Sequence, residues 1–287
     1  MPNTFVSFIH ESITQMTKTI FITGASKGFG KIWAEAFLKR GDNVVATARN
    51  TDSLNDLAKQ FGDKILPLSL NVNDREASFA AIKKAKEHFG SLDVVINNAG
   101  YGLFGAVEEA SEQEAREQFE TNVFGLLWVT QAALPIMREQ GKGHIIQISS
   151  ALGVATVPVL GLYNSTKWAV EGLSESLASE VKGFGIKVTI VEPNGYATDF
   201  GSGSATHSAS IPAYEPVKAA LFASFTDEGT GLPEATAEAM LKLTAAENPP
   251  LRLFLGKVGL PWAKQVYAER MEIWESWKEV AEKAHGK

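Results

Sequence analysis

The sequence predicts a doubly wound α/β fold, in which a parallel sheet of about seven strands is covered by helices on both faces. Short, nearly continuous apolar runs alternate with longer segments of helical spacing, which is typical of a parallel sheet buried on both faces. A glycine-rich segment directly follows the first apolar run. With 287 residues, of which 45% are hydrophobic, the chain is long enough to bury one large core.

We expect strands at the apolar runs 18–22, 43–48, 64–69, 92–96, 143–149, 186–191 and 251–255. Helices fill the intervals between them. In the interval 74–89, Asp74 stands near the start and Gly90 follows the end, which are start and stop signals for a helix. Right-handed crossovers between parallel strands would place a ligand at the carboxyl ends of the strands.

One domain is expected over residues 17–287. Residues 1–16 lack a basic segment followed by a long apolar core, so we interpret them as a disordered extension rather than a secretion signal. The segment 200–228 follows the last chemical motif and is expected to form a substrate lid. A C-terminal helix is expected over 258–284, and its apolar stripe of Val266, Ile273, Trp274, Trp277 and Ala281 is expected to pack onto the domain.

Composition excludes several classes of function. The net charge of −6 argues against nucleic acid or an anionic membrane as the main partner. No apolar run approaches the roughly 20 residues that span a bilayer. The chain has no cysteine, which suits a cytoplasmic location, and its five histidines show no metal-ligand spacing, so no metal site is predicted. The Gly-x-Ser-x-Gly pattern of many hydrolases is also missing.

Tyr163 and Lys167 suggest proton transfer. Four residues apart, they would share one face of a helix. A free tyrosine hydroxyl has a pKa of about 10. An ammonium about 4 Å away would stabilise the tyrosinate by about 4 kcal/mol at an effective dielectric constant near 20. This stabilisation would lower the tyrosine pKa by about 3 units. The spacing therefore predicts a tyrosine tuned for acid–base catalysis.

The segment from Thr23 to Gly30 reads Thr-Gly-Ala-Ser-Lys-Gly-Phe-Gly and lies between an apolar run and an amphipathic helix. A strand, a glycine turn and a helix N-terminus together form an anion site, because backbone N–H groups and the helix dipole face a phosphate. Gly24, Gly28 and Gly30 would permit the tight turn and the close approach of a pyrophosphate.

With these motifs, the chain resembles the short-chain dehydrogenase/reductase family over about residues 18–200. Asn97-Asn98-Ala99-Gly100 resembles a family element that closes a strand, Asn122 matches the catalytic asparagine, and Ser150 precedes Tyr163 by the usual thirteen residues. The resemblance implies a Rossmann-type fold and a catalytic set of Asn122, Ser150, Tyr163 and Lys167, with Asn122 holding a proton-relaying water. It implies cofactor contacts from Gly24, Ser26, Lys27, Gly28, Phe29, Gly30, Arg49, Asn71, Val72, Asn98, Ala99, Gly100, Tyr163, Lys167, Pro193, Tyr196 and Thr198.

Two cations favour NADP(H) over NAD(H). NAD-preferring relatives carry an acid after the second strand, where this chain has Ala48 followed by Arg49. Arg49 and Lys27 are expected to hold a 2′-phosphate. The chain departs from the family at Asn71, often an aspartate, and at Asn194, often a glycine. We expect Asn194 to keep its turn because asparagine tolerates left-handed backbone.

The resemblance places Ser150, Leu152, Leu160 and Tyr163 at the substrate. The residues between Ser150 and Tyr163 are mainly apolar and contain no Arg or Lys, which favours a hydrophobic ketone, aldehyde or secondary alcohol. We therefore predict an NADP(H)-dependent carbonyl/alcohol oxidoreductase. A catalytically silent NADP-binding sensor and an epimerase or dehydratase of a related class remain as alternatives. A homodimer or homotetramer is compatible with the resemblance, and the substrate and the reaction direction stay open.

Overall fold

The computed structural model describes residues 17–198 and 205–286. Its centre is a seven-stranded sheet in the order β3-β2-β1-β4-β6-β7-β9, with every neighbouring pair parallel. The predicted Rossmann-type fold and its strands are confirmed. Their bounds are β1 Thr19–Ile22, β2 Asn43–Ala48, β3 Ile65–Ser69, β4 Val94–Asn97, β6 Gly143–Ile148, β7 Ile186–Pro193 and β9 Arg252–Leu255.

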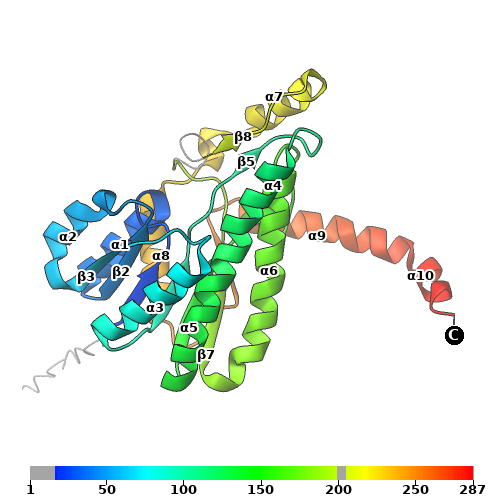
Figure 1. Ribbon diagram of the computed structural model, residues 1–287. Coiled ribbons are helices and arrows are strands. Elements are labelled where there is room, and N and C mark those ends of the chain that lie inside the picture. The colour runs from blue at the N-terminus through cyan, green and yellow to red at the C-terminus, as the bar shows by residue number, and fades with distance from the viewer. Residues whose placement is uncertain (1–16, 199–204, 287) are drawn as a thin grey trace, which may run out of the picture.

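Helices cover both faces of the sheet, as Figure 1 shows. One apolar core joins the sheet to α1 (Gly28–Arg40), α2 (Asn55–Phe61) and α8 (Thr236–Ala245). The other core joins it to α3 (Arg75–Phe89), α5 (Leu126–Gln140) and α6 (Gly161–Val181). The helix predicted over 74–89 is confirmed with its signals: the Asp74 side chain accepts a hydrogen bond from the Ala77 amide (2.9 Å), and Gly90 adopts a left-handed φ of 78°.

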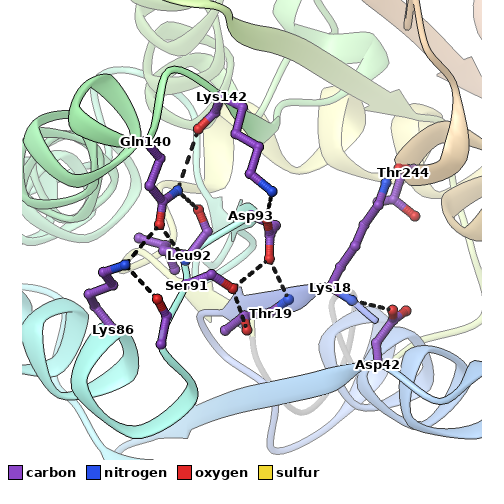
Figure 2. Close-up of polar contacts among 11 residues, drawn as sticks. Lys18, Thr19, Asp42, Lys86, Ser91, Leu92, Asp93, Gln140, Lys142 and Thr244 are labelled. Atoms are coloured by element: carbon purple, nitrogen blue, oxygen red, sulfur yellow. Dashed lines mark hydrogen bonds and ion pairs between the residues drawn. The ribbon is translucent and has the colours of Figure 1, made fainter. Parts of the chain in front are cut away.

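Polar side chains secure the amino ends of the central strands. Figure 2 shows Asp93 accepting hydrogen bonds from the Thr19 amide (2.9 Å) and the Ser91 hydroxyl (2.8 Å). The Gln140 side chain bonds both the amide and the carbonyl of Leu92, at 3.0 and 2.9 Å. These bonds satisfy backbone groups at one end of the sheet within the protein itself. Residues with the predicted chemistry lie at the other end.

Beyond the carboxyl ends of the strands lie β5 (Leu103–Phe104), β8 (Thr206–His207) and α7 (Glu215–Ser224). β5 and β8 pair in parallel, and Phe222 of α7 stacks on Phe104 with ring centroids 5.9 Å apart. The part of the predicted lid that the structure describes, from residue 205 onward, therefore lies over this end of the sheet. Its first residues, 200–204, and the predicted extension 1–16 lie outside the described residues.

The C-terminal segment differs from the expectation. Two helices, α9 (Gly259–Ser276) and α10 (Lys278–Ala284), meet at Trp277, and Figure 1 shows them running away from the sheet. Ile273, Trp274 and Trp277 are 60 to 64% exposed, so the prediction that this stripe packs onto the domain is wrong. An amphipathic pattern indicates that a face is apolar, but it does not specify which surface covers that face. Within the described ranges, no helix is both long and apolar enough to cross a membrane.

Candidate active site

Tyr163 and Lys167 lie one helical turn apart on α6 and are buried, with 5% and 6% of their surface exposed. The Lys167 ammonium donates a hydrogen bond to the carbonyl of Ile148 at 2.8 Å, which fixes it at the carboxyl end of β6. Its Nζ lies 5.6 Å from the centre of the Tyr163 ring. The spacing in the sequence therefore brings the two groups together at the end of the sheet where a ligand was expected.

The acidity of Tyr163 differs from the expectation. Burial raises the pKa of the Tyr163 hydroxyl above its usual value, and the hydrogen bond with Ser150 offsets this only in part. Burial also lowers the pKa of Lys167 to about 8, against the attraction of Glu171. The predicted lowering of the tyrosine pKa is thus wrong for the protein alone, because desolvation of both groups outweighs an ammonium that binds a backbone carbonyl.

Ser150 lies at the end of β6 and begins a short 3-10 turn, Ala151–Gly153. Its Oγ accepts a hydrogen bond from the Leu152 amide at 3.1 Å, and its hydroxyl also bonds with Tyr163. The turn holds the serine beside the tyrosine hydroxyl. A substrate oxygen could therefore accept hydrogen bonds from Ser150 and Tyr163 at the same time.

Asn122 lies in a π-helical turn, Glu120–Gly125, between α4 (Glu112–Phe119) and α5. Such turns insert one extra residue into a helix and often occur at functional sites. The Asn122 side chain is buried, donates to the carbonyl of Tyr101 (2.9 Å) and to the hydroxyl of Thr166 (3.1 Å), and accepts from the Tyr101 amide (3.0 Å). A methyl group on Gly100 would lie 3.1 Å from Asn122 Oδ1 and 3.8 Å from Lys167 Nζ, so both polar atoms face this glycine.

The glycine segment forms a tight cradle between β1 and α1. Gly24 and Gly28 have left-handed φ values of 67° and 52°. A Cβ on Gly30 would lie 2.3 Å from the Gly24 carbonyl oxygen, so only glycine fits at this position. The residue before α1, Lys27, makes no side-chain cap, and the first turn of α1 has no acidic residue. The helix N-terminus is thus suited to receive an anion from outside the chain.

The end of β4 is tied to this cradle. The Thr23 hydroxyl accepts hydrogen bonds from the Asn98 and Ala99 amides, both at 2.9 Å. The Asn98 side chain donates to the carbonyls of Thr23 (2.9 Å) and Gly24 (3.1 Å). Asn98 is predicted as a cofactor contact, and in the structure its side-chain nitrogen holds the glycine turn in shape.

The side chains that were expected to hold the adenosine lie at the ends of β2 and β3. Arg49 and Lys27 are both exposed, Arg49 directly after β2 and Lys27 in the glycine turn. Asn71 is exposed, and its Oδ1 accepts a hydrogen bond from the Asn73 amide at 3.2 Å. Val72 is buried in a core cluster and faces Gly125, so its side chain points into the protein.

The segment after β7 returns over the glycine cradle. Pro193 ends the strand, and a Cβ on Gly28 would lie 3.9 Å from Thr198 Cβ. The Tyr196 ring packs edge-on against Phe29, with centroids 5.1 Å apart. Among the described residues, Val159 is the only non-glycine residue with positive φ, so Asn194 does not use the left-handed backbone that was the reason given for its turn. Instead, Asn194 Nδ2 donates to the Gly195 carbonyl at 2.9 Å, which secures the turn without a left-handed backbone.

Apolar side chains pack against Tyr163. Phe104 and Leu160 form a buried cluster with Tyr163, and Leu152 packs against it. Next to it lies a cleft of about 510 Å³ between α7 and the loop before α6. The cleft is lined by Val157, Pro158, Pro216, Val217, Ala220, Leu221 and Ser224. The predicted apolar surroundings are therefore present. Ser224 contributes a hydroxyl group to the lining of the cleft.

Two ionic features of this region were not predicted from the sequence. Lys218 of α7 pairs with Glu109 at 2.7 Å, and Glu109 also accepts hydrogen bonds from the amides of Ile211 and Ala106, both at 2.7 Å. This pair joins the lid segment to the loop after β5, and no sequence signal links residues so far apart. The second feature, a carboxylate cluster around Arg252, had a weak signal, since Glu192 follows an apolar strand run and Glu171 lies one turn after Lys167.

Comparisons with known proteins agree with this geometry. The family described as short chain dehydrogenase matches residues 18–208. Oxidoreductase BOA17 of Botryotinia fuckeliana is 41% identical over 272 residues, which cover 93% of this chain and 98% of that protein. A short-chain dehydrogenase structure from Streptomyces avermitilis has a TM-score of 0.86 at 39% identity, covering 93% of this chain and 98% of that one.

A structure with bound nucleotide is also similar. The alcohol dehydrogenase of Thermococcus sibiricus, complexed with 5-hydroxy-NADP, has a TM-score of 0.70 at 29% identity and covers 85% of this chain and 98% of that chain. Within the described residues, no group of three or more His, Cys, Asp or Glu side chains could hold a metal ion. The chain belongs to the short-chain dehydrogenase/reductase family and is an oxidoreductase that uses a nicotinamide cofactor.

Proposed function

We propose that the protein is an NADP(H)-preferring oxidoreductase that interconverts a hydrophobic carbonyl compound and its alcohol, with Tyr163 as the acid–base group. The observation that carries this proposal is the meeting of Ser150, Tyr163 and Lys167 at the carboxyl end of β6. These three side chains have the chemistry that protonation of a carbonyl oxygen requires: a proton donor, a second hydrogen-bond donor and a neighbouring cation.

The glycine cradle fits a dinucleotide. Gly24 and Gly30 let the turn close tightly against the end of β4. The N-terminus of α1 has no side-chain cap and no acidic residue in its first turn, which suits it to a pyrophosphate. Ala99 and Gly100 at the end of β4, and the segment from Pro193 through Tyr196 to Thr198, would hold the nicotinamide end. Ser26, Phe29, Asn71 and Val72 would contribute the remaining contacts of the loop and the adenine side.

The preference for NADP(H) rests on charge at the end of β2. Arg49 and Lys27 are exposed cations, and Ala48 is buried where an NAD-preferring enzyme carries its acid. A guanidinium can bind a 2′-phosphate through two parallel hydrogen bonds. A carboxylate at the same place would repel that phosphate.

In the direction of reduction, Tyr163 gives its hydroxyl proton to the substrate oxygen as a C–H bond forms at the carbonyl carbon. The bound cofactor supplies the hydride. Burial keeps the Tyr163 hydroxyl protonated, which suits a general acid. Ser150 donates a second hydrogen bond to the developing alkoxide. Lys167 stabilises the tyrosinate that remains, and Asn122, whose Oδ1 keeps one lone pair, would hold the water that returns a proton through Lys167.

A hydrophobic substrate is supported by the apolar walls of the site. Leu152, Leu160 and Phe104 pack with the Tyr163 side chain, and the cleft along α7 adds to this apolar surface. Lys218, a lid cation that could have received an anionic substrate, is paired with Glu109. Each additional buried methylene of a substrate should improve the specificity constant by up to about 0.8 kcal/mol.

The experiment is a panel of carbonyl substrates of increasing apolar length, assayed with NADPH by nicotinamide absorbance. Tyr163→Phe should lower turnover by at least ~100-fold while the fold persists. Tyr267→Phe, at an exposed tyrosine of α9, is the matched control. Near-native turnover in Tyr163→Phe would exclude the acid–base role, and NADPH binding without turnover of any carbonyl would favour a silent sensor. Epimerase or dehydratase activity would appear as product formation without net change in NADPH.

A further inference from the structure

Three carboxylates meet one guanidinium beneath the site. Arg252, at the start of β9, contacts Glu171 of α6, lies 3.0 Å from Glu192 of β7 and lies 2.9 Å from Glu175 of α6. Glu171 and Glu192 are 5% and 0% exposed, whereas the Glu175 side chain is 62% exposed. Two buried acids therefore share one partly buried base, and a third acid on the same base faces solvent.

Glu171 lies behind the proposed catalytic groups. It follows Lys167 by one helical turn on α6, and the two charges attract each other. Its carboxylate also lies near the hydroxyl of Ser149, the residue before Ser150. A Cβ on Gly153 would lie 2.4 Å from Ser149 Oγ and 2.8 Å from Glu171 Oε1, so the 3-10 turn after Ser150 closes directly over the carboxylate. Glu171 thus contacts both elements that carry the proposed chemistry.

Glu171 and Glu192 lie on the same nitrogen of the Arg252 guanidinium, and each has one buried carboxylate oxygen, Glu171 Oε1 and Glu192 Oε2, without a hydrogen-bond partner among the described residues. Burial, followed by the nearby charge of Glu171, raises the pKa of Glu192 to about 7. Burial likewise raises the pKa of Glu171, against the pull of Ser149, Arg252 and Lys167. Burial and the closeness of the two acids therefore disfavour the ionisation of both at once.

We infer that Glu171 is a positioning residue for Lys167 and Ser150: Arg252, which it shares with Glu192, holds its carboxylate beneath the turn that follows Ser150 and one helical turn from Lys167. The groups that face Glu171 are Lys167 and Glu175 on its own helix, Glu192 on β7, Arg252 on β9 and Ser149 at the end of β6. From α9, Arg270 approaches the same turn and donates to the Val154 carbonyl at 2.9 Å. The inference rests on the proposed function only for its kinetic readout.

The first test needs no catalysis. The Lys167 side chain is titrated by NMR in protein with ¹³C-labelled lysine, its signal being assigned by its loss in Lys167→Arg. Replacing Glu171 by Gln should lower the Lys167 pKa by about 1 unit, since an opposite charge within about 4–6 Å is worth 1–3 units. Glu175→Gln is the matched control, because it removes an acid from the same Arg252 at an exposed position and should leave the Lys167 titration unchanged.

The variant Glu192→Gln distinguishes a charge effect of Glu171 on Lys167 from a general disturbance of the buried cluster. Glu192, whose pKa is about 7, is mostly ionised where Lys167 titrates, so Glu171 already carries its charge there and the Lys167 pKa should stay near the parent value in this variant while it falls in Glu171→Gln. With an active carbonyl substrate, the basic limb of kcat should shift in Glu171→Gln and keep its place in Glu192→Gln, and Glu171→Asp should restore part of the shift. A Lys167 titration that is the same in Glu171→Gln and the parent protein, or that falls in both variants, would overturn the inference even if the enzyme is active. Absence of carbonyl turnover in the parent would count against the proposed function alone.

Discussion

Gly30→Ala tests the shape of the glycine cradle. The added Cβ would lie 2.3 Å from the Gly24 carbonyl oxygen and 2.7 Å from Asn98 Nδ2, and both atoms are held by the hydrogen bond between them. Real Cβ contacts are not found below 3.0 Å, so the turn must move by a large fraction of an ångström. The displaced atoms belong to the backbone turn that would receive the pyrophosphate.

The expected change in the free energy of unfolding has two parts. Overpacking in a close-packed region costs about 1–3 kcal/mol, and the gain in helix propensity from glycine to alanine returns up to about 1 kcal/mol. A net loss of about 1–2 kcal/mol corresponds to a fall in Tm of about 2–8 °C. Affinity for NADPH should fall by at least about 10-fold, since a misplacement of about 1 Å in a binding element can cost up to 100-fold.

Thermal unfolding with increasing NADPH measures both effects, because the Tm gain at each concentration reports the affinity. Gly172→Ala is the control: its Cβ would meet no atom within 4 Å on the exposed side of α6, so stability should rise by about 0.5–1 kcal/mol and NADPH affinity should stay the same. If Gly30→Ala kept both its Tm and its NADPH affinity, the cradle would not have the shape described.

The remaining predictions concern cofactor choice, pH and the C-terminal helices. Arg49→Ala should raise the KM for NADPH much more than for NADH, and a parent protein that binds NADH more tightly would contradict the preference. Burial lowers the pKa of His144 to about 3, so the unfolded chain binds the extra proton and stability falls as pH drops from 6.5 toward 3. Urea unfolding should show a loss of about 2 kcal/mol between pH 6.5 and 5 from this residue, and His144→Gln should remove that slope. Deleting residues 271–287 should change Tm by no more than about 2 °C, since residues 271–286 are exposed throughout; a much larger fall would indicate that another copy of the chain covers them.

The fold could be predicted because its signals are local and repeated. The bounds of β2 agree with the predicted 43–48, and α3 begins and ends at the signals Asp74 and Gly90. The environment of the C-terminal stripe could not be predicted in this way. Trp274 and Trp277 lie on an apolar face, but a periodic pattern is the same whether that face meets its own domain or solvent.

Features of the candidate site that follow from residue spacing along the sequence could be predicted. Features that depend on which elements the fold brings together could not. Tyr163 and Lys167 share a helix face by their spacing alone. The meeting of Arg252 with Glu171 and Glu192 depends on the adjacency of β7 and β9 and on the packing of α6, which no local pattern specifies.

Burial explains why the tyrosine acidity was the least predictable property of the site. A charge pair at fixed spacing gives the sign of one contribution to the pKa, but the desolvation of Tyr163 and Lys167 depends on residues from β5, β6 and the loop before α6. The same burial gives the protein a protonated tyrosine beside a lysine whose pKa is about 8. A proton donor of this kind suits reduction of a carbonyl, whereas oxidation of an alcohol requires the tyrosinate. The positive charge that stabilises that tyrosinate therefore has to come from Lys167, which Glu171 behind it helps to keep protonated, and from the bound cofactor.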